Sequence, residues 1–506
     1  MRYLYASLAA AMMAAAAVLP ASAGTLLVPQ QFSTIQAALN AAKPYDTVLV
    51  SAKPKGGVYS ESVTITTPHV TLQGRGNPII DGSGFVPVSV PIPGSYYSNT
   101  VYPNAIDIRA DYTAISGLTV QNVPGAFFNV IGGAGINAGY NSADGSASYG
   151  FSGIRISGVT LSNDSNGIVV NGVISQVVNG KYTFTSAQGF SLIGCTLIGG
   201  LHDTVDISST NNLVISGNKF LGGNTFPGSS QTGLNIGAGF SEPITNVLIA
   251  ANVFKNNGGD GMDANATGLT ITANESASNG NYGILANTLS YSFSGPPVAV
   301  PGAAPTSIVA NSVHDNGVGG LTITGAQTIT GNSIANNAGY GIYLLNADNS
   351  TVAFNAITGT ALAVPAFAQS PYDNGTGIYA DDTGVSFGPV IASASEKIFG
   401  NQISGSAGDG IYLGAVTGCT VSYNNVSSSL GVGIHGSDFP TPGNTPNTIT
   451  QNRVLHNTIF DLRDDLVAAD DLDYNGSHFY GDNLPPIVNV WTKNQFVTAD
   501  PLGLSN

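Results

Sequence analysis

Ile329-Thr330-Gly331-Asn332-Ser333-Ile334 is one copy of the motif that decides the fold, an Ile or Val followed three positions later by Asn. Identical amides on successive turns of a chain can stack about 4.8 Å apart and hydrogen-bond to one another, and Asn tolerates the left-handed backbone of a sharp turn. We therefore predict an asparagine ladder with a structural role. Its members are Asn218, Asn252, Asn274, Asn311, Asn332, Asn355, Asn401, Asn424 and Asn452.

A second motif lies between these copies and consists of Gly, an apolar residue, a variable residue and another apolar or small residue. The shortest intervals between its copies are 21 residues (Gly320 to Gly341), 22 (Gly261 to Gly283) and 23 (Gly410 to Gly433). A unit near 22 residues is too short for helix-pair repeats and fits one coil of a solenoid. Copies begin at Gly167, Thr204, Gly233, Gly261, Gly283, Gly320, Gly341, Gly377, Gly410, Gly433 and, in degenerate form, Asp461.

Both motifs have the character of β-strands, because apolar residues alternate, β-branched residues are frequent and no long stretch has helical spacing. Strands that recur about every 22 residues with turns between them predict an all-β fold, a single-stranded right-handed parallel β-helix.

Three stretches resemble the repeats of the pectin-lyase-like superfamily: Ile215 to Phe220, Ile329 to Ile334 and Gly408 to Leu413. The opening from Phe32 to Val50 is similar to the N-terminal segment of many such proteins. The resemblance implies a short amphipathic helix that caps the open N-terminal end. It leaves the activity open, since this fold hosts lyases, hydrolases, esterases, epimerases and non-catalytic binders.

The chain divides into four predicted segments. Residues 1–23 read as a secretory signal peptide, with Arg2, an apolar stretch and a final Ala-Ser-Ala. Residues 24–62 form the N-terminal cap, 63–460 the β-helix and 461–506 an acidic capping segment. No later apolar run approaches the roughly 20 residues that span a bilayer, so we expect a secreted or periplasmic protein.

The composition and charge of the chain disfavour some classes of binding partner. Only 8% of the 506 residues are charged and the net charge is −15, which disfavours nucleic acid and anionic membranes, because both require basic surfaces. The two cysteines, Cys195 and Cys419, lie many coils apart and are predicted to be buried free thiols. A disulfide between them is the alternative, and it requires Cα atoms within about 7 Å.

The glycine motif defines one outward column of side chains. Its second and fourth residues are apolar or small and must face the core, so its third residue points outward on every coil. Tyrosines at three successive places, Tyr343, Tyr379 and Tyr412, would line sugar subsites together with Asn235 and His435, or would simply form a stabilising aromatic ladder. The column reads Val169, Asp206, Asn235, Asp263, Leu285, Thr322, Tyr343, Tyr379, Tyr412, His435 and Arg463.

The acidic part of this column is the candidate catalytic site. Asp206 and Asp263 lie two coils apart, each has a second carboxylate three residues earlier (Asp203 and Asp260), and His202 is adjacent. Such a group can act as an acid and base pair or hold calcium (Ca2+), and a separation of about 6.5 to 9.5 Å suits inverting glycoside hydrolysis. The alternative is that an Asp before Gly is ordinary turn chemistry.

Family likeness at this site is partial. Asp203 to Asp206 and Asp260 to Asp263 resemble the Asp-Gly-x-Asp strand of polygalacturonases, whose first Asp is catalytic, and residues 195–220 resemble the calcium-binding strand of pectate lyases. The further polygalacturonase motifs, Asp-Asp, Gly-His-Gly and Arg-x-Lys, are absent from the following coils. Lysine and arginine are scarce as well, which disfavours chemistry on polyanions unless calcium bridges substrate and protein.

Three hypotheses follow from the sequence. The first is a carbohydrate-active enzyme of hydrolase or lyase type that uses the acidic residues of the outward column. The second is a non-catalytic carbohydrate-binding or surface-adhesion module, and the third is a purely structural solenoid. Convergence of Asp203, Asp206, Asp260 and Asp263 would favour the enzyme, whereas dispersed, turn-bound carboxylates would favour the other two.

Overall fold

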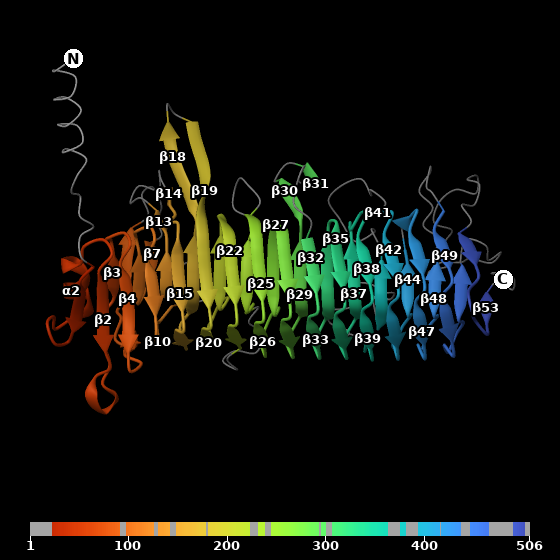
Figure 1. The fold of residues 1–506 in the computed structure, drawn as a ribbon, viewed down its shortest axis with the longest axis horizontal. Helices are drawn as coiled ribbons and strands as arrows, with labels where there is room; N and C mark the ends of the chain where they lie inside the picture. Colours follow the sequence, from red (N-terminus) through yellow and green to blue (C-terminus); the bar gives the residue numbers. More distant parts are fainter. Residues whose placement is uncertain are drawn as a thin grey trace, which may run out of the picture.

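One rod of stacked coils runs from the N-terminal to the C-terminal end of the chain (Figure 1). The computed structural model describes residues 23–91, 98–125, 130–141, 148–178, 181–222, 231–237, 244–292, 295–299, 306–362, 375–380, 393–414, 416–436, 446–464 and 489–500. The predicted all-β parallel β-helix is confirmed, since each strand pairs in parallel with the corresponding strand of the next coil. The predicted signal peptide lies, except for Ala23, outside the described residues.

The strands form three faces, which are named here in the order in which most coils visit them. The first face contains β1 (Thr25–Val28), β2 (Thr47–Ser51), β4 (Thr71–Arg75), β9 (Ala114–Ser116), β15 (Ile154–Ser157), β19 (Lys181–Ile193), β22 (Thr210–Ser216), β25 (Ile244–Ala250), the end of β27 (Met262–Thr272), β32 (Thr306–Val309), β35 (Gln327–Thr330), β38 (Thr351–Ala353), β42 (Lys397–Phe399), β46 (Thr420–Ser422), β49 (Thr448–Thr450) and β52 (Val490–Thr492).

The second face contains β5 (Ile79–Asp81), β10 (Thr119–Gln121), β16 (Thr160–Ser162), β20 (Thr196–Ile198), β23 (Lys219–Leu221), β26 (Val253–Lys255), β28 (Glu275–Ala277), β33 (Ser312–His314), β36 (Ser333–Ala335), β39 (Ala356–Thr358), β43 (Gln402–Ser404), β47 (Asn425–Ser427) and β50 (Arg453–Leu455).

The third face carries the outward column. It contains β3 (Val63–Ile65), β8 (Ile106–Ile108), β12 (Ala134–Ala138), β17 (Asn166–Asn171), β21 (Val205–Ser208), β24 (Leu234–Gly237), the start of β27, β29 (Tyr282–Asn287), β34 (Gly319–Thr324), β37 (Tyr340–Leu345), β40 (Thr376–Ala380), β44 (Ile411–Leu413), β48 (Ile434–Gly436), β51 (Leu462–Asp464) and β53 (Ala499–Asp500). The predicted boundary at residue 460 thus falls just before β51, which continues the parallel pairing with β48.

Helix α2 (Ile35–Ala41) lies at the N-terminal end, as the opening sequence predicts (Figure 1). Thr34 caps it, because its hydroxyl accepts a hydrogen bond from the Ala37 N–H at 3.1 Å. The Glu61 carboxylate accepts two more, from the backbone N–H groups of Ile35 and Gln36. The apolar side of the helix buries Ile35, Ala38 and Leu39 against the first coils.

The glycines of the third face are required by the stacking of coils. A β carbon built on Gly261 would lie 2.5 Å from the carbonyl oxygen of Gly283, and one on Gly377 would lie 2.6 Å from that of Gly410. Only glycine allows this approach, which explains why the residue recurs at the start of the motif. The apolar residues that follow it, such as Ile284 and Ala286, are buried in the core as predicted.

The predicted asparagine ladder exists and is buried. Asn311 shows the pattern: its Nδ2 donates to Asn332 Oδ1 at 3.0 Å, and its own Oδ1 accepts from both the N–H and Nδ2 of Asn274. One part of the prediction is wrong, since the left-handed residue is the one before each Asn, for example Ala310 with φ 56° and Gly331 with φ 65°. The Asn contributes its buried side-chain amide to the ladder, and the left-handed residue before it bends the chain at the corner.

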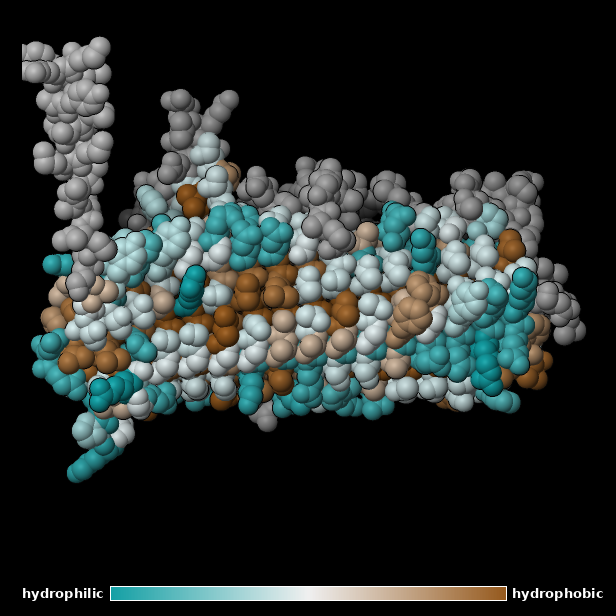
Figure 2. Space-filling model, in the orientation of Figure 1, coloured by the Kyte–Doolittle hydropathy of each residue, from teal (hydrophilic) through white to brown (hydrophobic). Residues whose placement is uncertain are grey.

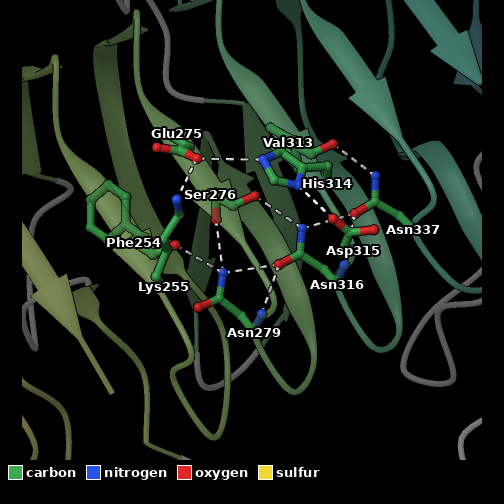
Figure 3. Close-up of polar contacts among 10 residues, drawn as sticks. All are labelled: Phe254, Lys255, Glu275, Ser276, Asn279, Val313, His314, Asp315, Asn316 and Asn337. Carbon is green, nitrogen blue, oxygen red and sulfur yellow. Dashed lines mark hydrogen bonds and ion pairs between the residues drawn. The ribbon is translucent and has the colours of Figure 1, made fainter. Parts of the chain in front are cut away.

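A second asparagine ladder, which the sequence analysis missed, lies at the corner between the second and third faces (Figure 3). Asn279 Nδ2 donates to Asn316 Oδ1 at 2.9 Å, and Asn316 Nδ2 donates to Asn337 Oδ1 at 2.8 Å. Asn257 precedes them, with its Nδ2 2.8 Å from Asn279 Oδ1. Two corners of the coil are therefore held by buried amides.

Insertions leave the regular coils on one side of the rod. Figure 1 shows β18 (Val173–Val178) with β19, and β30 (Leu289–Ser292) with β31 (Gly295–Ala299), projecting in the same direction. Figure 2 shows an apolar band over the middle of the visible side. On the first face, Val214 of β22 and Leu248 of β25 are 36% and 37% exposed. Within the described residues, no helix is long and apolar enough to cross a membrane. Cys195 and Cys419 are both buried, and neither forms a disulfide, as predicted.

Candidate functional site

The parallel register places the outward column as the sequence predicts. Asp206 pairs with Asn235 on the next coil, and Asn235 pairs with Asp263 on the coil after that. The column continues without interruption through Leu285, Thr322, Tyr343, Tyr379, Tyr412, His435 and Arg463. Since neighbouring strands lie about 4.8 Å apart, the backbones of Asp206 and Asp263 are about 10 Å apart.

Four carboxyl groups on these coils influence one another electrostatically. Burial, together with the nearby Asp203 charge, raises the pKa of Asp206 to about 6. Burial raises the pKa of Asp263 to about 7, with the charges of Asp260 and Asp203 adding to the shift. Asp260 has a pKa of about 6, again chiefly because of burial. The four carboxyl groups therefore interact electrostatically, and both burial and mutual repulsion favour their protonated forms.

Two members of this group also anchor the backbone. Asp203 Oδ1 accepts a hydrogen bond from the Thr232 N–H at 3.0 Å, and Asp260 Oδ1 accepts one from the Tyr282 N–H at 3.0 Å. Each bond joins the turn before a third-face strand to the next coil. Asp203 and Asp260 therefore each bind the backbone of the next coil, whereas neither bond involves the outward Asp206 and Asp263.

Amide side chains order the carboxylates further. Asn235 Nδ2 donates to Asp203 Oδ2 at 3.1 Å, and Asn265 Nδ2 donates to Asp263 Oδ1 at 3.1 Å. His202 is partly exposed in the turn before β21, and its charge lowers the pKa of Asp203 against the larger effect of burial. The predicted catalytic residues and Asn235 thus lie together on three consecutive coils.

The calcium prediction has no matching ligand set in the part of the chain that the structure describes. No group of three or more His, Cys, Asp or Glu side chains there is placed to hold a metal ion.

The tyrosines depart from the predicted exposed strip. Tyr379 and Tyr412 are only 3% and 5% exposed, and they form a hydrophobic cluster with Tyr340 outside the coil core. The Tyr379 and Tyr412 rings stack with centroids 5.0 Å apart and planes 10° apart, while Tyr343 contacts Tyr379 edge-on at 5.1 Å. Because their faces contact other rings, Tyr379 and Tyr412 act as the ladder that was the alternative, and Tyr343 alone of the three is partly exposed.

His435 ends the aromatic row and has a partner that the sequence analysis missed. Its Nδ1 lies 2.8 Å from Asp409 Oδ2, and its ring meets the Tyr412 ring edge-on at 5.2 Å. Asp409 Oδ1 accepts from the Val432 N–H at 2.7 Å, as Asp203 does from Thr232. The signal was present in the spacing, because Asp409 stands at the same motif position as Asp203 and Asp260.

Comparison with known proteins identifies the fold. The family model described as "Right handed beta helix region" matches residues 219–357 and 265–462. This chain folds as a right-handed parallel β-helix. No curated protein matches its sequence significantly.

Solved structures similar to this β-helix have different functions and low sequence identity. The A-module of the Azotobacter vinelandii mannuronan C-5 epimerase AlgE4 is 15% identical, with 83% of this chain and 89% of that chain covered and a TM-score of 0.43. A GH87 α-1,3-glucanase from Streptomyces thermodiastaticus is 14% identical, with 87% of this chain and 70% of that chain covered and a TM-score of 0.46. PfbA, a surface adhesin of Streptococcus pneumoniae, is 11% identical, with 84% of this chain and 86% of that chain covered and a TM-score of 0.39.

The β-helix carries another charged group on its second face (Figure 3). Lys255 Nζ lies 2.6 Å from Glu275 Oε1, and His314 contacts both Glu275 and Asp315. Hydrogen bonding to Lys255 lowers the pKa of Glu275, and hydrogen bonding to His314 lowers that of Asp315. These partly exposed side chains lie beside the second asparagine ladder (Figure 3), and this cluster contributes no residue to the outward column.

Proposed function

We propose that this β-helix is an exported carbohydrate-active protein that hydrolyses a polysaccharide with Asp206 and Asp263 as its proton-transferring residues. The observation that carries the proposal is the pair of outward carboxyl groups on alternate coils, with pKa values of about 6 and about 7. A carboxyl group that is half protonated near neutral pH can donate a proton in one step and accept it in another.

The separation of the pair favours hydrolysis with inversion. Backbones about 10 Å apart leave space between the carboxyl groups for a sugar and a water molecule, as inverting glycosidases require. In this arrangement one carboxylic acid protonates the leaving oxygen, and the other, ionised, removes a proton from the attacking water. Asp203 and Asp260 hold the two turns in place and, by their charge, keep one proton within the group.

Neutral glycans suit this surface better than polyuronates. Elimination from a uronate requires a cation to neutralise the carboxylate, and the outward column contains one Lys or Arg, Arg463, well away from Asp206 and Asp263. The alternative is a non-catalytic carbohydrate-binding or adhesion module. It is favoured by the backbone bonds of Asp203 and Asp260, because these bonds give both carboxylates a structural role that does not depend on catalysis.

The test is a reducing-sugar and 235 nm absorbance screen of the mature protein against neutral and acidic polysaccharides, with and without calcium. Turnover should fall at least about 100-fold in an Asp206→Asn, Asp263→Asn double variant, because proton transfer contributes 10² to 10⁴ in rate. Asp107→Asn is the matched control, since Asp107 occupies the same column on β8 but pairs with Arg109. Binding without turnover, unchanged in the double variant, would overturn the enzyme and support the binding module.

A further inference from the structure

Phe354 and Tyr423 are exposed aromatic residues at the corner between the first and second faces. They directly follow β38 and β46, and they are 64% and 61% exposed. The register places Gly400 between them on the intervening coil, so their backbones lie two coils, or about 10 Å, apart. This corner lies across the coil from the third face and shares no residue with the outward column.

The backbone at this corner does not favour either ring. Both residues are left-handed, with φ 55° for Phe354 and 57° for Tyr423, whereas Gly331 and Gly400 occupy the same corner on neighbouring coils. A bulky side chain is strained in this conformation and glycine is not. Since rings this exposed add little to the core, the stability of the coil does not account for them, and strain of this kind points to a function.

The Phe354 ring is held in place by two neighbours. Phe399 meets it edge-on, with centroids 5.2 Å apart and planes at 85°. A β carbon built on Gly400 would lie 2.6 Å from Phe354 Cε1, so the ring covers this glycine. Because Gly400 has no side chain, nothing rises from the intervening coil between Phe354 and Tyr423.

A row of polar side chains runs beside the rings on the second face. Gln402 lies two residues after Gly400, and Asn425 lies two residues after Tyr423. Asn425 Nδ2 donates to Gln402 Oε1 at 2.8 Å, and Arg453 Nη1 on the next coil donates to Asn425 Oδ1 at 3.1 Å. Side-chain amides ordered in this way at the surface can donate to and accept from the hydroxyl groups of a ligand that stacks on the rings.

The strip between the two rings carries no charge. Lys397 and Arg453 lie outside it, at the start of β42 and one coil beyond Tyr423. Aromatic rings beside neutral amides suit a ligand with apolar C–H faces and many hydroxyl groups. The strip is flanked by Ala353, Phe399 and Ser422 on the first face and by Ala356, Gln402 and Asn425 on the second.

We propose that Phe354, Gly400 and Tyr423 form a second polysaccharide-binding surface, which takes an extended neutral chain along the axis of the rod. The two-coil spacing of the rings is similar to the length of a disaccharide in such a chain, so the rings contact alternate sugars. This inference rests on the proposed function for the class of ligand. It uses no residue of the outward column, so a chain bound at this corner leaves the third face uncovered.

Glycine substitutions separate binding from structure. A Phe354→Gly, Tyr423→Gly double variant removes both rings and gives the corner the residue that it already has at Gly331 and Gly400. Glycine adopts the left-handed backbone without strain, so the urea midpoint of the double variant should not fall. A structural role for the rings predicts the opposite result.

Two single variants complete the design. Tyr112→Gly is the matched control, because Tyr112 is also exposed, at 56%, and left-handed, with φ 56°. Its ring instead stacks on His69 of the preceding coil, with centroids 4.7 Å apart. Gln402→Ala tests the polar row and leaves both rings of the surface in place.

The measurement is retention on microcrystalline cellulose, insoluble xylan, chitin and cross-linked polygalacturonate. We expect at least one of the three neutral polysaccharides to retain the parent, with an affinity that falls about tenfold in the double variant and less in Gln402→Ala. Tyr112→Gly should be retained like the parent.

Equal retention of the parent and the double variant overturns the surface, as does an equal loss of retention in Tyr112→Gly. Retention of the parent on polygalacturonate alone, or on none of the neutral polysaccharides, also overturns it. A reducing-sugar assay on soluble polysaccharides reports separately on Asp206 and Asp263. Absence of turnover together with ring-dependent retention overturns the proposed hydrolysis and supports the surface.

Discussion

The ring of Tyr340 lies across Gly319 of the preceding coil. A β carbon built on Gly319 would lie 2.5 Å from Tyr340 Cε2 and 2.8 Å from Cζ. This approach lets the Tyr340 hydroxyl pair with Thr322 Oγ1 at 2.9 Å and brings its ring to 6.0 Å from that of Tyr282. Because the Tyr282 N–H binds Asp260, the aromatic row is continuous with the acidic residues.

Replacing Gly319 with Ala should therefore displace the Tyr340 ring. We expect a loss of about 1 to 3 kcal/mol in the free energy of unfolding, the usual cost of overpacking. Chemical denaturation monitored by near-ultraviolet circular dichroism measures both the stability and the tyrosine environment. Gly237→Ala is the control, since nothing lies within 4 Å of a β carbon there. Equal stability of the two variants would contradict this account of Gly319.

The repeat made most of the fold predictable. Each coil must place the same residue types at the same corners, so the spacing of Asn332 from Asn311 and Asn355 revealed a ladder before its contacts were known. The second ladder was hidden because its column is short and varied, and serine replaces Asn at Ser406 and Ser429. Which residue takes the left-handed corner depends on backbone geometry that composition alone does not show.

The sequence predicted which side chains of the candidate site point outward, but it did not predict all of their hydrogen-bond and packing partners. Period-2 alternation alone placed Asp206 and Asp263 on the outside. The contact between Asp409 and His435 joins residues 26 apart on different coils, so it emerges only once the register is known. The burial of Tyr379 also escaped the analysis, because alternation says which way a side chain points and not what packs over it.

Substitution of one Asn in the first ladder tests how much the ladder contributes to the free energy of unfolding. Asn311→Ala removes the Oδ1 acceptor of Asn274 and the amide that serves Ile271 O and Asn332. Leaving buried groups unpaired should cost about 2 to 4 kcal/mol, measured by urea denaturation. Asn425→Ala, which breaks an exposed amide bond to Gln402, should change stability by less than about 0.5 kcal/mol. A small effect at both positions would show that the buried ladder is dispensable.

The acidic residues should make stability depend on pH in a defined direction. A carboxyl group with a raised folded pKa binds a proton in the folded state that the unfolded chain has already released. Its contribution to the free energy of unfolding is fully present below the unfolded pKa and is lost as pH rises through the folded pKa. For Asp263 the unfolded pKa is about 4 and the folded pKa is about 7, so the loss occurs between these values.

Asp263→Asn should therefore reduce the loss of stability between pH 5 and pH 8, by on the order of 1 kcal/mol after allowance for solvent screening. Guanidine denaturation of the parent and the variant at both pH values measures the difference. Asp46→Asn is the control and should leave the change between pH 5 and pH 8 unaltered, because hydrogen bonds from the Lys43 and Gly24 backbone N–H groups lower the pKa of Asp46 and its titration lies below this range. An unchanged pH profile in Asp263→Asn would contradict the coupling of the four carboxyl groups.

The contact between a turn carboxylate and the outward residue of the next coil, as in Asp409 and His435, should form at other coils when His is placed at the outward position. Asn235→His places an imidazole opposite Asp203, and Leu285→His places one opposite Asp260, in the register that joins Asp409 to His435. Each new ring should bond to the carboxylate through Nδ1 and show the Nδ1–H tautomer by 15N NMR. Tyr343→His is the control, because Gly319 stands at the turn position of the preceding coil and its neighbours in the column are Thr322 and Tyr379. The same tautomer bias at residue 343 would mean that the carboxylate is not its cause.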